Sequence, residues 1–222
     1  MGVDELLFRS INGVAGQSSL LDWVGIELAK PGNLLYPILL AAAYWAWLNW
    51  RECVIGGAML AAVVGATDAL GTQLKGLVQR PRPCVTLADV HQLLGCGGAF
   101  SFPSNHAANT ASAAAFFQVL YPKSGWISWP LVAAVGVSRV YIGAHYLTDV
   151  IGGWVVGGLV GATVAYFLRR WSRFRPVTES ASSSRAATTR SASAIAATPP
   201  AGTRPVSRIG SSGKSCPCMS FH

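Results

Sequence analysis

Residues 34–50, LLYPILLAAAYWAWLNW, decide the fold because they form a long apolar run without a single charge. A helix that crosses a bilayer needs roughly 20 mostly apolar residues. Similar apolar segments follow at residues 53–71, 107–121, 127–140 and 150–168. The sequence therefore predicts an all-α, integral-membrane bundle of about six transmembrane helices.

The N-terminal segments determine the helix count and the orientation. Residues 19–30 are apolar but short and contain Asp22 and Glu27, so they form the sixth helix only if it extends toward the N-terminus. Residues 3–11 have the pattern of an amphipathic helix at the membrane interface. With the N-terminus in the cytoplasm, the cytoplasmic helix ends carry more Arg and Lys than the opposite ends, as the positive-inside rule requires.

The composition separates a membrane-embedded body from a basic tail. Only 12% of the residues are charged and 51% are hydrophobic, whereas soluble domains carry about 25% charged residues. Residues 1–168 contain as many Lys and Arg as Asp and Glu, so the net charge of +8 belongs to the remainder. We expect residues 1–170 to form a transmembrane domain. Residues 171–222, rich in Ser, Ala and Thr, are expected to form a disordered cytoplasmic tail that suits anionic lipid and not nucleic acid.

The cysteines give no zinc-binding pattern. Cys84 and Cys96 lie in one predicted outer loop, where an oxidising compartment would allow a disulfide. The unknown geometry of that loop leaves free thiols equally open. Cys216 and Cys218 do not form a C-terminal prenylation motif, because four residues follow the second of them.

Polar residues gather at the expected outer ends of the apolar segments, and the richest run is Ser138-Arg139-Val-Tyr-Ile-Gly-Ala-His145-Tyr-Leu-Thr-Asp149. His145 and Asp149 are four residues apart, so on a helix they share a face, with Ser138 two turns away on the same side. An acidic partner fixes the tautomer of a histidine and leaves its other nitrogen as a nucleophile or base. Arg139 offers a planar pair of donors to phosphate oxygens. A purely structural His–Asp pair is an equally open interpretation.

A second run, Phe102-Pro103-Ser104-Asn105-His106, precedes an alanine-rich helix. Ser104 is expected to cap this helix, which leaves the backbone N–H groups of Asn105 and His106 free to bind an anion. His106 would then be placed to act as a general acid. The alternative is an ordinary capping serine beside a surface histidine.

Counted along the chain, the first of the three runs is Lys75-Gly-Leu-Val-Gln-Arg80-Pro81-Arg82-Pro83, the second begins at Phe102 and the third at Ser138. The first run ends an apolar segment because its prolines stop the helix. Lys75 is then expected at a helix end and Arg82 in an extended loop, although both could simply be interfacial cations. Asp68, seven residues earlier, either supports the site or packs within the bundle. Together the three runs supply cations, a hydroxyl, backbone donors, two histidines and an aspartate. This set fits phosphoryl transfer through a covalent histidine intermediate without a catalytic metal.

The three runs resemble the signature of the type 2 phosphatidic acid phosphatases, a superfamily that includes bacterial undecaprenyl-diphosphate phosphatases and vanadium haloperoxidases. The family pattern is Lys-x6-Arg-Pro, then Pro-Ser-Gly-His, then Ser-Arg-x5-His-x3-Asp. The resemblance covers about residues 19–168 and departs at one position, where Asn105 replaces glycine. Asparagine tolerates positive φ next best to glycine, so the backbone cradle is expected to survive, while the amide could change the fit of the head group.

The resemblance implies a role for each matching residue. His145 is similar to the family's nucleophile, oriented by Asp149, and His106 resembles the acid that protonates the leaving group. A phosphate cradle is implied for Lys75, Arg82, Ser104, Arg139 and the backbone at Asn105. The family also implies six spans, no metal, no other cofactor, and a site on the extracytoplasmic face of what would be a bacterial inner membrane.

We therefore predict a metal-independent membrane hydrolase that removes phosphate from a lipid phosphate or diphosphate, with undecaprenyl diphosphate as the favoured substrate. Phosphatidic acid, phosphatidylglycerophosphate, lipid A phosphates and phosphate transfer to another lipid are the alternatives. The alternative from a different class is a non-catalytic lipid-phosphate binder or transporter. The intact residues His106, His145 and Asp149 argue against a binder, and the lack of inverted repeats in the sequence argues against a transporter.

Overall fold

The computed structural model describes residues 2–30, 32–33 and 35–171, and this part of the chain is all-helical, as the sequence predicts. The predicted tail at residues 171–222 lies outside the described residues except for Trp171. The helices are α1 (Val3–Asn12), α2 (Ser19–Ala29), α3 (Leu35–Leu48), α4 (Trp50–Val78), α5 (Pro83–Thr86), α6 (Asn105–Leu120), the 3₁₀ helix η1 (Pro122–Ser124), α7 (Gly125–Tyr141) and α8 (Leu147–Trp171).

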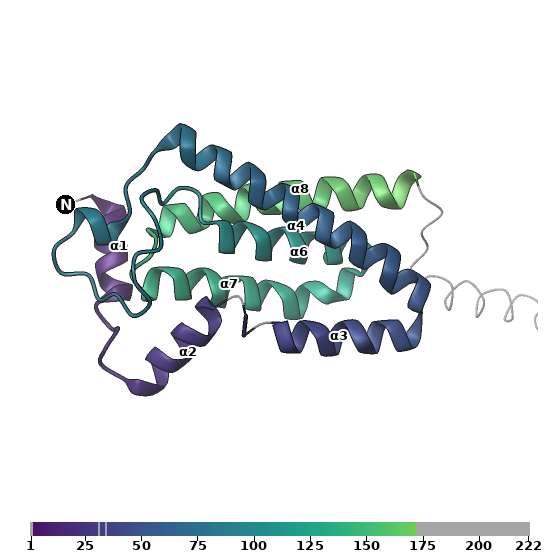
Figure 1. The fold of residues 1–222 in the computed structure, drawn as a ribbon, viewed down its shortest axis with the longest axis horizontal. Coiled ribbons are helices and arrows are strands. Elements are labelled where there is room, and N and C mark those ends of the chain that lie inside the picture. The colour runs from purple at the N-terminus through teal and green to yellow at the C-terminus, as the bar shows by residue number, and fades with distance from the viewer. Residues whose placement is uncertain (1, 31, 34, 172–222) are drawn as a thin grey trace, which may run out of the picture. The chain divides into compact units, whose positions relative to one another are not determined.

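The five long apolar segments of the sequence form α3, α4, α6, α7 and α8. Within the described residues, α4 and α8 are the two helices long and apolar enough to cross a membrane. The 29 residues of α4 extend about 44 Å, more than the roughly 30 Å of a hydrocarbon core. Figure 1 shows α6 among α4, α7 and α8, and it contacts all three. Large apolar side chains such as Leu40 and Trp47 of α3 face outward, which suits a lipid-facing surface.

Small residues bring α6 and α8 into close contact. A Cβ atom added at Gly157 would lie 1.9 Å from the carbonyl oxygen of Ala108, and one added at Gly161 would lie 2.1 Å from that of Ser112. Interfaces between membrane helices use small residues in this way so that the backbones can approach closely. The contact fixes the helix that begins at Asn105 against the helix that begins at Leu147.

The structure differs from the predicted topology in the N-terminal part of the chain. α2 has 11 residues, about 16 Å of helix, and is too short to cross a bilayer. The Tyr141 hydroxyl, at the end of α7, donates to Asp22 near the start of α2 over 2.7 Å, and Arg139 donates to the carbonyl oxygen of Ala29, the last residue of α2, over 3.0 Å. Both ends of α2 therefore lie against the end of α7, and α2 does not span the bundle.

α1 lies at this same end of the bundle. Asp4 of α1 accepts a hydrogen bond from the backbone N–H of Thr148 at the start of α8 over 3.2 Å. The N-terminus, marked N in Figure 1, is therefore at the end where α7 leads into α8. The sequence placed the N-terminus and the site at opposite ends of the bundle, whereas the structure places α1 and α2 at the same end as the start of α8.

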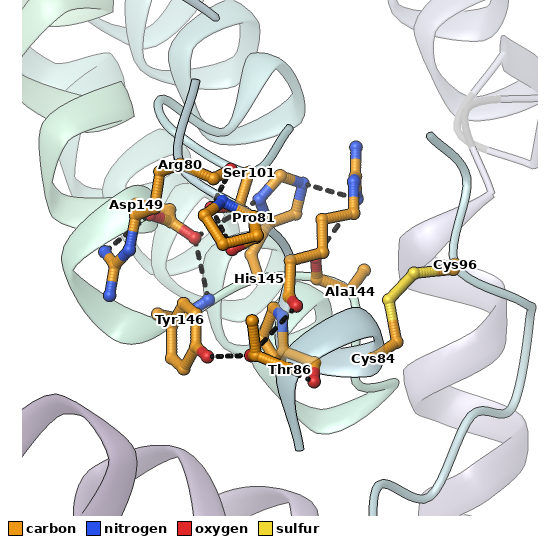
Figure 2. The surroundings of a disulfide bond; sticks show 12 residues. Arg80, Pro81, Cys84, Thr86, Cys96, Ser101, Ala144, His145, Tyr146 and Asp149 are labelled. Atoms are coloured by element: carbon orange, nitrogen blue, oxygen red, sulfur yellow. Dashed lines mark hydrogen bonds and ion pairs between the residues drawn. A yellow bond between two sulfur atoms is a disulfide. The ribbon is translucent and has the colours of Figure 1, made fainter. Parts of the chain in front are cut away.

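The segment between α4 and α6 folds back over this end of the bundle. α4 continues one turn beyond Lys75 and ends at Val78, where Gln79 adopts a left-handed conformation with φ of 51°. Cys84 and Cys96 form a disulfide, which resolves the two states that the sequence left open. This disulfide, drawn in Figure 2, ties α5 to the loop that precedes α6.

Candidate active site

Hydrogen bonds join the three polar runs at one end of the bundle. The Lys75 ammonium, in the last turn of α4, donates to the carbonyl oxygen of Pro103. The backbone N–H of Ser104 donates to the carbonyl oxygen of Asp149 over 2.9 Å. The first bond links the first run to the second, and the second bond links the second run to the third. Residues from α4, the start of α6 and the start of α8 therefore converge.

Arg82 completes the connection between the first run and the third. Its Nη1 donates to the carbonyl oxygen of Ala144 over 3.0 Å and lies 3.3 Å from Nε2 of His145. The backbone of Arg82 is extended, with φ of −76° and ψ of 155°, and the residue precedes α5. Its side chain is buried, so the guanidinium is held beside the imidazole and directed away from bulk solvent.

His145 lies between Arg82 and Asp149. It precedes α8 and is not part of it, yet its Nδ1 lies 3.7 Å from Oδ2 of Asp149. The side chains of both residues are almost completely buried, with 2% and 0% of their surface exposed. Figure 2 shows His145 beside Asp149, and it also draws the disulfide, which belongs to the segment between α4 and α6. One ring nitrogen therefore faces the carboxylate and the other faces a cation.

Burial and the nearby arginines Arg82 and Arg139 lower the pKa of His145 to about 4, although the contact with Asp149 opposes this effect. The imidazole is therefore neutral at neutral pH. Burial also lowers the pKa of Arg82, but a guanidinium keeps its charge in proteins. A neutral imidazole next to a fixed cation can present its Nε2 lone pair to an electrophile that the cation attracts.

His106 occupies the second position of α6 and belongs to the same site. Both histidines interact electrostatically with Arg82 and Arg139, and Lys75 interacts with the same two arginines. The two imidazoles are therefore at the same end of the bundle, around one cluster of cations.

Several buried donors in this cluster lack a hydrogen-bond partner among the described residues: the Oγ of Ser104 and the Nε atoms of Arg82 and Arg139. Ser104 occupies the N-cap position of α6, but its hydroxyl does not cap the helix, contrary to the prediction. Unpaired buried donors are costly. Their convergence at the start of a helix makes a site suited to an anion with several oxygens.

The family of the chain follows from comparison with known proteins. The model of the PAP2 superfamily, the family that the three polar runs resemble, matches residues 54–173. The chain belongs to the PAP2 superfamily. It is 30% identical to undecaprenyl-diphosphatase of Bacillus subtilis (strain 168) over 159 residues, which cover 70% of this chain and 79% of that protein. It is 35% identical to phosphatidylglycerophosphatase B of the same organism over 165 residues, 68% of this chain and 76% of that protein.

A solved structure supports the same assignment. The transmembrane PAP2 type phosphatidylglycerolphosphate phosphatase of Bacillus subtilis matches with a TM-score of 0.60 and 27% identity, over 78% of this chain and 87% of that one. The protein is therefore a membrane lipid phosphatase, a hydrolase of lipid phosphates. Within the described residues of this PAP2 protein, no three His, Cys, Asp or Glu side chains are placed together to hold a metal ion.

The departure from the PAP2 pattern at Asn105 has a structural explanation. The side-chain amide of Asn105 points toward α4, where it donates to Oδ1 of Asp68 over 2.9 Å. A Cβ atom at Gly71 would lie 2.7 Å from the amide oxygen, so the amide packs closely against this glycine. Asn109, one turn further along α6, also donates to Asp68, over 3.0 Å. The amide therefore packs between α4 and α6, and the first-turn backbone of α6 remains available to the site.

Ser138 does not reach the PAP2 site, although its spacing suggested that it would. Its hydroxyl donates to the carbonyl oxygen of Val135 in its own helix over 2.7 Å. The sequence alone did not assign Arg80 to the site. In the structure its Nη1 donates to Oδ1 of Asp149 over 2.8 Å, and its Nη2 donates to Asp4 over 2.5 Å. Its place inside the first polar run was the one available signal, and nothing in the sequence connects Asp4 to a partner 76 residues away.

Proposed function

We propose that this PAP2 phosphatase removes the terminal phosphate from a polyprenyl diphosphate, with undecaprenyl diphosphate as the favoured substrate. The observation that carries the proposal is that His106 and His145 interact with the same pair of arginines, Arg82, which is buried, and Arg139, which is half-buried. Phosphoryl transfer needs this arrangement, because cations must neutralise the equatorial oxygens while a nucleophile and an acid lie on opposite sides of the phosphorus.

The first half of the reaction transfers the phosphoryl group to His145. Its neutral Nε2 attacks the terminal phosphorus, while the Asp149 carboxylate stabilises the positive charge that develops at Nδ1. The bond between phosphorus and the bridging oxygen breaks, and protonated His106 gives its proton to that oxygen. Lys75, Arg82, Arg139, the Ser104 hydroxyl and the backbone N–H of Asn105 hold the transferred oxygens. The lipid monophosphate leaves, and the phosphoryl group remains on His145.

The second half returns the enzyme to its starting state. His106, now neutral, accepts a proton from a water molecule that attacks the phosphohistidine. The bond between phosphorus and Nε2 breaks, which releases inorganic phosphate and regenerates neutral His145 and protonated His106. A second lipid with a free hydroxyl in place of this water would give phosphate transfer between lipids, so water attack is a defining part of the proposal. No step requires a metal ion.

We further propose how the chain lies in the membrane. Six apolar helices, α2, α3, α4, α6, α7 and α8, are embedded in the bilayer, and α2 enters from the site end without crossing. The disulfide beside Arg82 supports an oxidising compartment for the site end, and we assign that end to the extracytoplasmic side of a bacterial inner membrane. The far end of α8 carries Arg169 and Arg170 and suits the cytoplasmic side, to which we also assign the basic C-terminal tail.

The choice of substrate rests on the relatives. Undecaprenyl-diphosphatase of Bacillus subtilis aligns over 79% of its length. Phosphatidylglycerophosphate is the second candidate because phosphatidylglycerophosphatase B is 35% identical to this chain. The cradle contacts only the phosphoryl group, so side-by-side kinetics with both lipids and phosphatidic acid must separate them. We expect the highest kcat/KM for undecaprenyl diphosphate.

The mechanism is tested with purified protein in detergent micelles containing EDTA. We expect phosphate release to persist with EDTA, and we expect His145→Ala to lower kcat about 10³-fold or more, as nucleophile removal does elsewhere. His91→Asn is the matched control, because His91 contacts the carbonyl oxygen of Ala15 through Nδ1 and lies outside the catalytic cluster. Activity of His145→Ala near that of the control, or a requirement for Mg²⁺, would refute the mechanism. Labelled ¹⁸O in the released phosphate distinguishes attack by water from transfer to a lipid.

A further inference from the structure

Arg80 bridges two carboxylates that come from opposite ends of the described chain. Its Nη1 donates to Oδ1 of Asp149 over 2.8 Å and to the Thr148 hydroxyl over 2.6 Å. Its Nη2 donates to Oδ2 of Asp4 over 2.5 Å. The guanidinium also lies 4.2 Å from the centre of the Tyr146 ring, and Figure 2 shows Arg80 beside Asp149 and Tyr146. Three elements, α1, the segment after α4 and the start of α8, therefore meet at one side chain.

This bridge determines which oxygen of Asp149 faces His145. Oδ1 is occupied by Arg80, while Oδ2 accepts the backbone N–H of Tyr146 over 2.9 Å and lies 3.7 Å from Nδ1 of His145. The carboxylate is completely buried, and a buried charge is costly without a partner of opposite sign. Arg80 therefore pairs with the buried carboxylate and keeps its second oxygen directed toward the imidazole.

Asp4 holds Arg80 in turn. Its carboxylate accepts the backbone N–H of Thr148 over 3.2 Å and the hydroxyl of Thr148 over 2.6 Å. A carboxylate at a first-turn N–H is favourable because the start of a helix carries partial positive charge. Burial alone would raise the pKa of Asp4, but the hydrogen bonds from Thr148 and Arg80 hold it below its usual value. Asp4 is therefore ionised at neutral pH and restrains both Arg80 and the start of α8.

We propose that Arg80 is a positioning residue for the carboxylate that orients the nucleophilic histidine, and that Asp4 makes α1 part of the active site through Arg80. The inference rests on the roles proposed above for His145 and Asp149. The family match begins at residue 54, so Arg80 lies inside the matched region while Asp4 lies outside it. The N-terminal helix therefore contributes to catalysis through a contact beyond the matched region.

Other charges around Asp149 limit the expected effect. Lys75 and Arg82 also interact electrostatically with Asp149, and His145 faces its second oxygen. Loss of Arg80 therefore removes the cation in direct contact and leaves two more distant ones. We expect a partial loss of function, because the carboxylate loses the contact that fixes its orientation toward His145.

The test compares Arg80→Gln, Arg80→Lys, Asp4→Asn and Asp4→Glu in the full-length protein in detergent micelles, with the lipid diphosphate as substrate. We expect Arg80→Gln to lower kcat about 10²-fold, the scale of a misplaced catalytic group, with little change in KM. Arg80→Lys should recover part of the loss at neutral pH because it restores a cation. Asp4→Asn should lower kcat about tenfold in the same way, and Asp4→Glu should retain most of the activity.

Glu5→Gln is the matched control, because Glu5 lies next to Asp4 in α1 and pairs with Arg9 in the same helix over 3.0 Å. It should retain wild-type kcat and pH dependence. The inference is overturned if Arg80→Gln and Asp4→Asn melt at lower temperature but keep the wild-type kcat and pH profile, or if they raise KM alone. Should Arg80→Gln fail to fold, Asp4→Asn and Arg80→Lys still decide the question. Activity in His145→Ala would instead refute the proposed function, whatever the Arg80 variants do.

Discussion

The contact between α6 and α8 predicts that Gly157→Ala harms both stability and catalysis. The new Cβ would lie 1.9 Å from the carbonyl oxygen of Ala108 and 2.7 Å from its carbonyl carbon. Both atoms are main-chain atoms near the start of α6, so no side chain can move aside, and the two helices must separate by about 1 Å or more. Overpacking of this kind costs roughly 1–3 kcal/mol or more, while alanine recovers about 1 kcal/mol of helix propensity. We expect a net loss of about 2 kcal/mol.

The same displacement acts on the site, because Ser104 and His106 are at the start of α6 while Asp149 is in the first turn of α8. A shift of 1 Å between catalytic groups can cost about 10²-fold in rate. Thermal unfolding in detergent should show a melting temperature lower by about 4–8 °C, and phosphate release should fall with it.

Gly158→Ala is the control for this experiment, since the neighbouring glycine has no heavy atom within 4 Å of an added Cβ. It gains helix propensity without a clash, so its melting temperature should stay level or rise and its activity should not change. The reasoning is refuted if Gly157→Ala is as stable and as active as Gly158→Ala.

Two further predictions concern single side chains of the site. Because the pKa of His145 is lowered to about 4, kcat/KM should decrease as the pH falls through about 4. A histidine with the ordinary pKa of about 6.5 would cause this decrease at a higher pH. The same lowered pKa should make the protein less stable below about pH 6.5, where the unfolded chain takes up the proton first. Melting curves of wild type and His145→Asn test this, and equal pH slopes would contradict it. Asn105→Gly should keep kcat within a few-fold, because its amide faces Asp68, but should lose about 1 kcal/mol of stability. Asn105→Asp should lose more stability, because it places a second carboxylate beside Asp68. A large fall in kcat for Asn105→Gly would contradict this geometry.

The sequence predicts the long helices well because a bilayer imposes a simple local rule. The mostly apolar runs become α3, α4, α6, α7 and α8, with bounds within three residues of those expected except at the end of α4, which lies seven residues further along the chain. The rule fails for residues 19–30, which are apolar enough for a span but too short for one. Their ends contact Tyr141 and Arg139 instead, and such contacts between distant parts of the chain leave no local pattern.

The sequence predicts those site residues whose polar side chains stand out at the ends of apolar segments. Lys75, Arg82, His106 and His145 stand out for this reason, and the structure brings them together. A local sequence pattern does not reveal where a side chain points. Ser104 has the residue type and the position of a helix cap, yet its hydroxyl does not cap α6. Arg80 looked like one more interfacial cation, and its contact with Asp149 depends on how the loop after α4 folds over α8.

The location of α1 has a practical consequence for studies of the protein. A purification tag or fluorescent protein joined ahead of Val3 would be held next to Asp4 and Thr148, at the end of the bundle that carries the site. A fusion placed after α8 starts some 25 residues further along the helix, about 37 Å from the chemistry. Fusion proteins for kinetics and for reporter-based topology mapping should therefore carry their labels at the C-terminal side.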